Sequence, residues 1–251
     1  MTTPPVAVLS DIHGNRWALE AVLDDIRRRG IRDMVNLGDC LYGPLDPAGT
    51  ARILMELAMP TVSGNEDRII LDEPGRHPDA ASLPFVKEAI KPEHCAWLET
   101  LPFTASAFEV FFLCHGTPQR DDAYLLWEVH AAGCSLLPAE AVAQALLAIP
   151  QPVILCGHDH LQALLRLPGG RHVIDPGSVG LPAYRDDRPF PHAMEAGSPH
   201  ARYSVVTAGG AQGSPEVMNV SVAYDWDEAA RTAERNGRPD WAACLASGRA
   251  S

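Results

Sequence analysis

Side chains that can bind metal ions follow five short apolar runs of the sequence. The runs are residues 6–10, 31–37, 61–63, 108–114 and 153–156. The side chains that follow them are Asp11, His13, Asp39, Asn65, His115, His158 and His160. These carboxylate, amide and imidazole groups could bind two divalent ions if one aspartate bridges them. Two such ions can share a water molecule and lower its pKa, so the set indicates metal-dependent hydrolytic chemistry.

Each of these clusters, taken alone, also fits an ordinary turn. Asp39 could form a turn after its glycine, and Gly64-Asn65 is a common turn signal. His158 and His160 are a stronger signal, because residues i and i+2 face the same side of an extended chain. Five polar clusters, each directly after an apolar run, are very hard to explain as five separate turns. We therefore interpret them as one metal centre.

The spacing of apolar residues predicts elements that would bring these side chains together. The five apolar runs read as strands. Helical spacing predicts helices at 16–29 and 47–57 between the first three of them. This alternation predicts parallel βα units. In such sheets ligand sites form at the carboxyl ends of the strands, where the polar clusters lie.

The rest of the chain is expected to contain loops and closing elements. A surface loop is predicted at 70–84, an excursion at 120–137 and a mobile loop at 182–200. The other predicted elements are short helices at 92–98 and 138–149, a hairpin at 161–174, strands at 202–207 and 216–222, and helices at 225–236 and 239–246. The excursion and the mobile loop are expected to frame the site.

Composition excludes several classes of function. Apolar residues make up 46% of the 251 residues, and the formal net charge is −12. A core of good size is therefore expected, whereas a nucleic-acid polymer or an anionic membrane surface is not an expected partner. No apolar stretch is long enough for a membrane span, and the first eleven residues are too quickly polar for a signal peptide. We expect a cytoplasmic protein whose six cysteines are free thiols.

The order of the motifs, D-x-H, GD, GN, H and GHxH, resembles that of the calcineurin-like metallophosphoesterases. The run Asp11-Ile12-His13-Gly14-Asn15 is similar to their small bacterial branch of phosphodiesterases and phosphatases, and 43–44, 115–118 and 176–180 match as well. The resemblance implies an α/β fold, a four-layer α/β/β/α sandwich of two mixed β-sheets flanked by helices. It also implies one domain over 1–251, in which 216–251 forms a closing strand and C-terminal helices.

The resemblance further implies a role for each candidate ligand. Asp11, His13 and His160 would bind the first divalent ion, Asn65, His115 and His158 the second, and Asp39 would bridge them. A hydroxide shared by the two ions could then attack phosphorus in line, without a protein nucleophile. Mixed imidazole, carboxylate and amide ligands favour manganese, with Fe, Zn, Co or Ni as alternatives. The expected substrate is a small phosphomonoester or phosphodiester.

Glu66 is the main departure from the motif of this family, in which many members have histidine after the asparagine. That histidine protonates the leaving oxygen, and such help is typically worth about 10²–10⁴-fold. Glu66 could act as the acid if its pKa were raised. Alternatively, the site could lack an acid and prefer good leaving groups, or the protein could have drifted towards binding. We favour an active enzyme.

Three further residues are candidates for substrate contacts. Asn15 could contact phosphate, or it could only cap the helix that begins at residue 16. Tyr124 and Arg185 lie on the two segments expected to frame the pocket, although both would also be ordinary as surface residues. The alternative function is a non-catalytic scaffold with the metallophosphoesterase fold; a protein phosphatase is a weaker third. A homo-oligomer is compatible with each of these functions.

Overall fold

The computed structural model describes residues 3–73, 75–78, 80–209 and 214–250. Its first sheet has the strand order β13-β12-β1-β2. These strands are β1 (Val6–Leu9), β2 (Asp33–Asn36), β12 (Ala201–Thr207) and β13 (Glu216–Val222). β1 runs parallel to β2, as the βα pattern predicts, and antiparallel to β12. The carboxyl ends of β1 and β2 therefore lie side by side.

The second sheet has the strand order β3-β4-β7-β9-β8. These strands are β3 (Thr104–Ala107), β4 (Phe111–Cys114), β7 (Val153–Leu155), β8 (Gln162–Arg166) and β9 (His172–Pro176). β4, β7 and β9 are parallel neighbours, and the two edge strands are antiparallel to them. The histidines that follow β4 and β7 therefore leave the sheet at the same edge.

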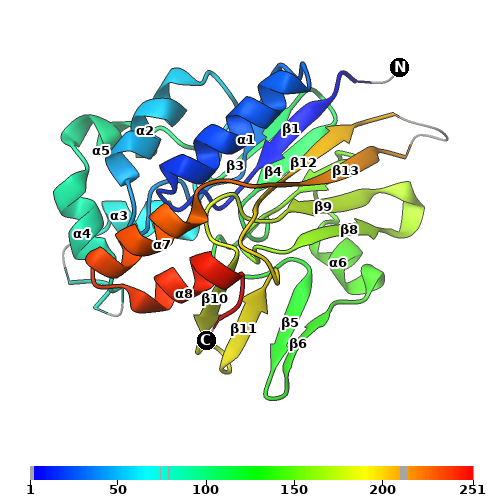
Figure 1. Cartoon of the computed structure of the whole chain (residues 1–251). Helices are drawn as coiled ribbons and strands as arrows, with labels where there is room; N and C mark the ends of the chain where they lie inside the picture. Colours follow the sequence, from blue (N-terminus) through cyan, green and yellow to red (C-terminus); the bar gives the residue numbers. More distant parts are fainter. Residues whose placement is uncertain (1–2, 74, 79, 210–213, 251) are drawn as a thin grey trace.

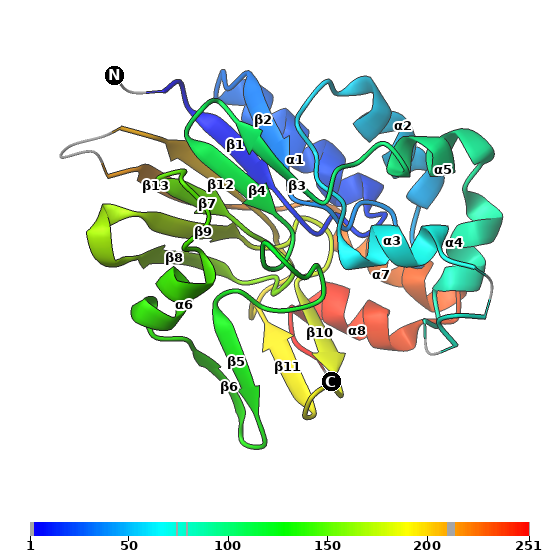
Figure 2. The same ribbon diagram turned by 180° about the vertical axis from the view of Figure 1, so that it is seen from behind.

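Helices cover the outer faces of both sheets (Figures 1 and 2). The helices are α1 (Arg16–Arg28), α2 (Pro47–Glu56), α3 (Asn65–Leu71), α4 (Leu83–Ala89), α5 (Pro92–Leu98), α6 (Ala139–Ala145), α7 (Trp226–Arg235) and α8 (Pro239–Ser247). A core cluster that includes Leu9 and Leu19 packs the first sheet against every helix except α6. Another, with Phe112 and Val142, packs α6 on the second sheet.

The two sheets face each other across a third apolar cluster. Val6, Val8 and Val35 of the first sheet contact the layer that contains Phe111 and Leu155 of the second. Alternate residues of β1 thus point to different cores, because successive side chains of a strand face opposite sides. The predicted four-layer α/β/β/α sandwich of two mixed sheets is confirmed. Within the described ranges, no helix is long and apolar enough to cross a membrane.

Two hairpins project from the sandwich beside the edge where the polar clusters lie (Figure 1). One consists of β5 (Trp127–His130) and β6 (Gly133–Leu136), within the predicted excursion. The other consists of β10 (Ala183–Asp186) and β11 (His192–Glu195). The prediction of a mobile loop at 182–200 is therefore wrong. Proline, glycine and charged residues there suggested a loop, but the pairing of two separate segments supplies the backbone hydrogen bonds of a hairpin.

Candidate metal centre

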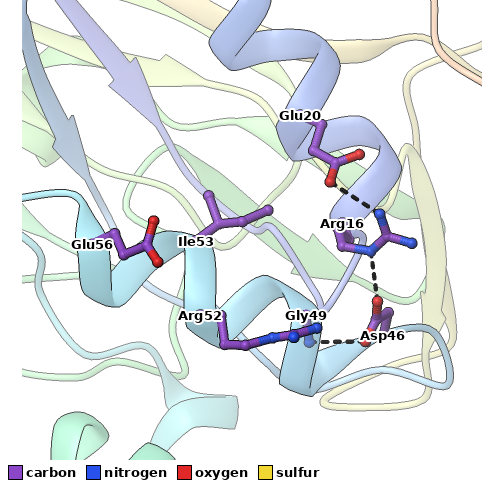
Figure 3. A pocket seen from close by; sticks show the side chains of 7 residues that line it. All are labelled: Arg16, Glu20, Asp46, Gly49, Arg52, Ile53 and Glu56. Atoms are coloured by element: carbon purple, nitrogen blue, oxygen red, sulfur yellow. Dashed lines mark hydrogen bonds and ion pairs between the residues drawn. The ribbon is translucent and has the colours of Figure 1, made fainter.

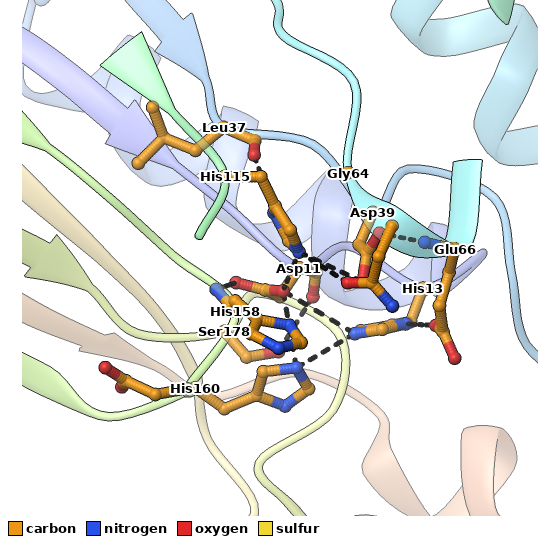
Figure 4. A network of polar contacts seen from close by, with 12 residues as sticks. Asp11, His13, Leu37, Asp39, Gly64, Glu66, His115, His158, His160 and Ser178 are labelled. Carbon is orange, nitrogen blue, oxygen red and sulfur yellow. Dashed lines mark hydrogen bonds and ion pairs between the residues drawn. The ribbon is translucent and has the colours of Figure 1, made fainter. Parts of the chain in front are cut away.

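The predicted ligands converge where the strand ends of the two sheets meet. Figure 4 shows His13, Asp39, His115, His158 and His160 gathered around Asp11. One group of ligand atoms, all within 4.8 Å of one another, comes from Asp11, His13 and His160. A second group comes from Asp39, His115 and His158, and a third from His13, Asp39 and Glu66. Asn65 joins the second group, because its Oδ1 atom lies 3.1 Å from His115 Nε2.

The backbone at this site adopts an unusual conformation. Asp11, His13, Asp39, His158 and His160 have φ angles of 55°, 52°, 52°, 76° and 65°. The left-handed region costs a residue with a side chain about 1–2 kcal/mol. Such residues persist where the surrounding structure holds them, and they gather at functional sites. The loops after β1 and β2 hold each other here, because Asp11 N–H donates to Gly38 O and His13 N–H donates to Asp39 O.

Three of the four histidines are oriented by backbone carbonyl groups. The Nδ1 atom of His13 lies 3.2 Å from Tyr42 O, that of His115 lies 2.8 Å from Leu37 O, and that of His160 lies 2.7 Å from Leu181 O. A carbonyl oxygen only accepts, so Nδ1 carries the hydrogen in each ring. In the neutral ring this leaves the lone pair on Nε2, which faces the centre. Metal-binding histidines characteristically have such an outer hydrogen bond.

Asp11 provides the test of whether a cation fits. Its Oδ1 atom is buried and accepts no hydrogen bond from the described part of the chain. The Nε2 atoms of His160, His13 and His115 nevertheless surround it at 3.3, 3.8 and 3.9 Å. A buried carboxylate oxygen without a donor is costly unless it is paired or binds a metal. The donor set therefore fits a divalent ion.

The charges of the centre shift the pKa values of its groups in the metal-free chain. Burial opposes ionisation of Asp11, but the neighbouring histidines outweigh it and hold the Asp11 pKa well below its usual range. The Asp39 pKa is also lowered, chiefly by His115 against the effect of burial. For His158, burial and the charge of His115 lower the pKa to about 4. The His158 ring is thus neutral at pH 7.

Glu66 lies beside His13, with its Oε2 atom 3.0 Å from His13 Nδ1. Burial raises the Glu66 pKa to about 7, although His13 acts in the opposite direction. Its side chain is 23% exposed, although the Oε2 atom itself is buried. The backbone N–H of Glu66 donates to Asp39 Oδ1 at 2.8 Å. Glu66 therefore contacts two candidate metal ligands: its side chain contacts His13, and its backbone contacts Asp39.

Asp67 is a site residue that the sequence did not single out. It is fully buried, and its carboxylate accepts hydrogen bonds from Cys40 N–H at 2.9 Å and Gly64 N–H at 3.1 Å. Cys40 adjoins Asp39, and Gly64 adjoins Asn65, so Asp67 ties together the two turns that carry these ligands. The acidic residue three positions after Gly64, at the start of a helix, was the available signal.

The structure distinguishes between the candidate substrate contacts. Asn15 is buried, and its side chain caps α1 through Ala18 N–H and donates to Gly180 O and Tyr224 Oη. These bonds occupy both ends of the amide, so the cap is the role that the structure supports for Asn15. A phosphate contact would require some of them to break.

Tyr184, not Arg185, faces the candidate ligands from β10. The ring of Tyr184 packs 4.5 Å from that of His160, measured between centroids. Arg185 points to the other side of the strand and donates to Ala250 O. Tyr124 does lie at the centre, with its ring 5.1 Å from that of His158. The sequence missed Tyr184 because the alternation of a strand was not expected in this segment.

A cavity of about 330 Å³ lies away from this centre, between α1 and α2 (Figure 3). Arg16, which lines it, donates to Asp46 at 2.6 Å and to Glu20 at 3.0 Å. Asp46 in turn caps α2 through Gly49 N–H. These charges are satisfied by one another, and we assign the cavity no part in the chemistry.

Comparisons with known proteins agree with this geometry. Residues 5–194 match the family model described as the calcineurin-like phosphoesterase superfamily domain. The uncharacterized protein MJ0912 of Methanocaldococcus jannaschii is 26% identical over 261 residues, which cover 96% of each chain.

Two solved structures share the fold over nearly the whole chain. They are a metallophosphoesterase from Sphaerobacter thermophilus (TM-score 0.72, 23% identity) and the hypothetical protein PH1004 from Pyrococcus horikoshii OT3 (TM-score 0.73, 20% identity). Each match covers 98% of this chain and 99% of the other.

Proposed function

The chain belongs to the calcineurin-like phosphoesterase superfamily, and on this premise we propose that it is a hydrolase that uses two divalent metal ions to cleave a small phosphate ester. One observation carries the proposal. Three histidines from separate strand ends bond through Nδ1 to backbone carbonyl oxygens and direct Nε2 towards two buried aspartates. This arrangement fixes the ring orientations that a metal centre needs before any ion arrives.

The ligand groups suggest how two ions would be held. Asp11, His13 and His160 would bind one ion, and Asn65, His115 and His158 would bind the other. Asp39 would bridge them, since it lies within 4.8 Å of His13 in one group of ligand atoms and of His115 and His158 in another. Nitrogen and oxygen ligands of this kind suit manganese, which we propose as the metal; Fe, Zn, Co and Ni are alternatives.

When bound, the two ions would stabilise negative charge on the phosphoryl oxygens and lower the pKa of a water molecule for attack on phosphorus. The chain contributes fixed geometry. The carbonyl groups of Tyr42, Leu37 and Leu181 keep the hydrogens of three rings on Nδ1. Asp11 and Asp39 are 0% and 2% exposed, so solvent does little to screen their charge.

The proposed substrate is a small phosphomonoester or phosphodiester. Substrate would meet Tyr124 and Tyr184, which lie against His158 and His160. We further propose a cytoplasmic location, where a reducing environment would keep the six cysteines as thiols.

Hydrolysis of p-nitrophenyl phosphate and bis-p-nitrophenyl phosphate tests the proposal. Protein stripped of metal by a chelator should be inactive, and Mn²⁺ should restore cleavage of at least one ester. His115→Ala should not respond to Mn²⁺. His130→Ala should respond as the unchanged protein does, because His130 lies on β5 outside the ligand groups.

Metal analysis decides what an inactive protein means. If two ions are bound per chain and neither ester is cleaved with any of the five metals, the catalytic proposal is wrong. The fold would then serve as a metal-bound scaffold that binds partners.

A further inference from the structure

Three side chains outside the ligand set form a hydrogen-bonded chain that ends on the loop of His158. Tyr184 Oη donates to the carbonyl oxygen of His158 at 3.0 Å. The hydroxyl oxygens of Tyr184 and Tyr124 are 2.6 Å apart, and Tyr124 Oη lies 2.9 Å from His192 Nε2. The other ring nitrogen of His192, Nδ1, lies 2.8 Å from Phe190 O. Both ends of the chain are therefore anchored on backbone carbonyl groups.

The same tyrosines pack against the rings of the ligands. The Tyr184 ring lies 4.5 Å from that of His160, and the Tyr124 ring lies 5.1 Å from that of His158. Tyr124 belongs to the segment that follows β4, whereas Tyr184 and His192 belong to β10 and β11. The segment after β4, whose only proposed ligand is His115, and the β10–β11 hairpin, which supplies none, thus both contact the loop 157–160.

This loop needs support from outside itself. His158 and His160 both have positive φ angles, 76° and 65°, a backbone conformation that persists only where surrounding contacts hold it. One such contact comes from Asp11, whose Oδ2 atom accepts from His158 N–H at 3.1 Å. The segment around β10 supplies two more, the Tyr184 hydroxyl on His158 and the Leu181 carbonyl on His160 Nδ1.

We propose that Tyr184 is a positioning residue for both metal ions, and that Tyr124 and His192 hold its hydroxyl in place. His158 belongs to one ligand group and His160 to the other, so the 157–160 loop serves both ions. Loss of the Tyr184 hydroxyl therefore lowers the affinity for both ions, whereas loss of a single ligand lowers mainly the affinity for one ion. This inference rests on the metal centre proposed above.

Direct measurement of Mn²⁺ binding tests the role of Tyr184. Metal-free full-length protein is titrated with Mn²⁺, and bound ion is followed by calorimetry and by electron paramagnetic resonance. Tyr184→Phe keeps the ring against His160 and removes only the hydroxyl. Outer partners of metal ligands are typically worth about 10–100-fold in affinity, so we expect both ions to bind about 10-fold more weakly.

Tyr203→Phe is the matched control. Tyr203 is a buried tyrosine of β12 whose hydroxyl donates to Asp25 of α1 at 2.7 Å, outside the metal centre. It also loses one buried hydroxyl, so it reports what such a loss does to the fold. We expect unchanged Mn²⁺ affinity in this variant. Thermal unfolding of the metal-free proteins measures the general loss of stability separately.

The outcomes separate this inference from the proposed function. If the unchanged protein binds no divalent ion, the proposed metal centre fails. If it binds two ions and Tyr184→Phe binds both equally well, or loses affinity for one alone, the positioning role is wrong. Should Tyr184→Phe not fold, Tyr124→Phe decides. This variant keeps the bond from Tyr184 to His158 but removes the hydroxyl that contacts Tyr184 on the other side. A smaller loss of affinity for both ions would support the positioning role of Tyr184. Unchanged affinity would overturn it.

Discussion

The Nε2 atoms of His13 and His160 lie 3.0 Å apart, although the two residues are 147 positions apart in the chain. Both rings carry a hydrogen on Nδ1, because each Nδ1 faces a backbone carbonyl oxygen. In two neutral rings the lone pairs of Nε2 would face each other directly. A proton or a cation has to lie between them, so protons and metal ions compete for the same position.

This competition predicts that Mn²⁺ binding releases protons and strengthens as pH rises. Burial lowers the pKa of His13, but the bond to Glu66 and the charges of Asp39 and Asp11 outweigh it and raise the pKa to about 9. Burial also lowers the pKa of His115, but the charges of Asp39 and Asp11 outweigh it and raise this pKa to about 10. Both rings are therefore protonated at pH 7 without metal. Their raised pKa values mean that the protons leave only as pH rises or a cation displaces them.

We expect Mn²⁺ affinity to rise between about pH 6 and 9, by up to about tenfold per pH unit for each proton released. Calorimetry at pH 7 in buffers with different ionisation enthalpies measures the number of protons. Affinity that does not depend on pH, with no proton release, would falsify this account of the centre.

Asp39→Asn should disrupt both ion positions. The change removes the negative charge and one acceptor oxygen from the residue proposed to bridge the ions. We expect metal analysis to give at most one ion per chain, and kcat/KM for nitrophenyl esters to fall by at least about 100-fold, since even outer partners of ligands are worth about 10–100-fold. Asp24→Asn, at an exposed aspartate of α1 paired with Arg27, is the control. Two bound ions and near-normal activity in Asp39→Asn would remove Asp39 from the bridging role.

Glu66→Gln tests whether the departure from the family motif has a catalytic cost. Glu66 lies against His13 Nδ1, so we expect it to orient this ligand rather than to protonate the leaving group. The variant should then change the hydrolysis of nitrophenyl and alkyl phosphodiesters by similar, small factors. A general acid would instead matter only for the alkyl ester, whose leaving oxygen needs a proton. A loss of about 10²-fold or more that is confined to alkyl esters would establish Glu66 as the acid.

Asn15→Ala should lower stability and spare the metal centre. The variant removes the cap of α1 and leaves Gly180 O without its donor. We expect the free energy of unfolding to fall by about 1–2 kcal/mol. For a chain of this size that corresponds to a Tm lower by about 2–8 °C. Thermal unfolding of the metal-free protein and metal analysis check this. An unchanged Tm with a raised KM would show that Asn15 contacts substrate.

The identity and order of the proposed ligands could be predicted from the sequence alone. Val6–Leu9, Phe111–Cys114 and Val153–Leu155 are apolar runs that form strands, and a proposed ligand follows each of them within three residues. β4 and β7 are parallel neighbours that end at one edge of the second sheet, so local patterns were enough to bring His115 and His158 together. Asp11 follows β1 of the other sheet and joins them only because the two sheets pack face to face. The type of each side chain then restricted the chemistry to metal binding.

Only the tertiary structure decided what surrounds those ligands. The carbonyl oxygen that orients His160 belongs to Leu181, and the hydroxyl beside His158 belongs to Tyr184. The sequence of their segment predicts a loop, because neither Ala183–Asp186 nor His192–Glu195 has a clear strand pattern by itself. The two runs become strands only by pairing with each other. The register of that pairing directs Tyr184 inward and Arg185 outward. Helix and strand periodicity arise from neighbours along the chain, whereas such contacts depend on how distant segments pack, and no local pattern records them.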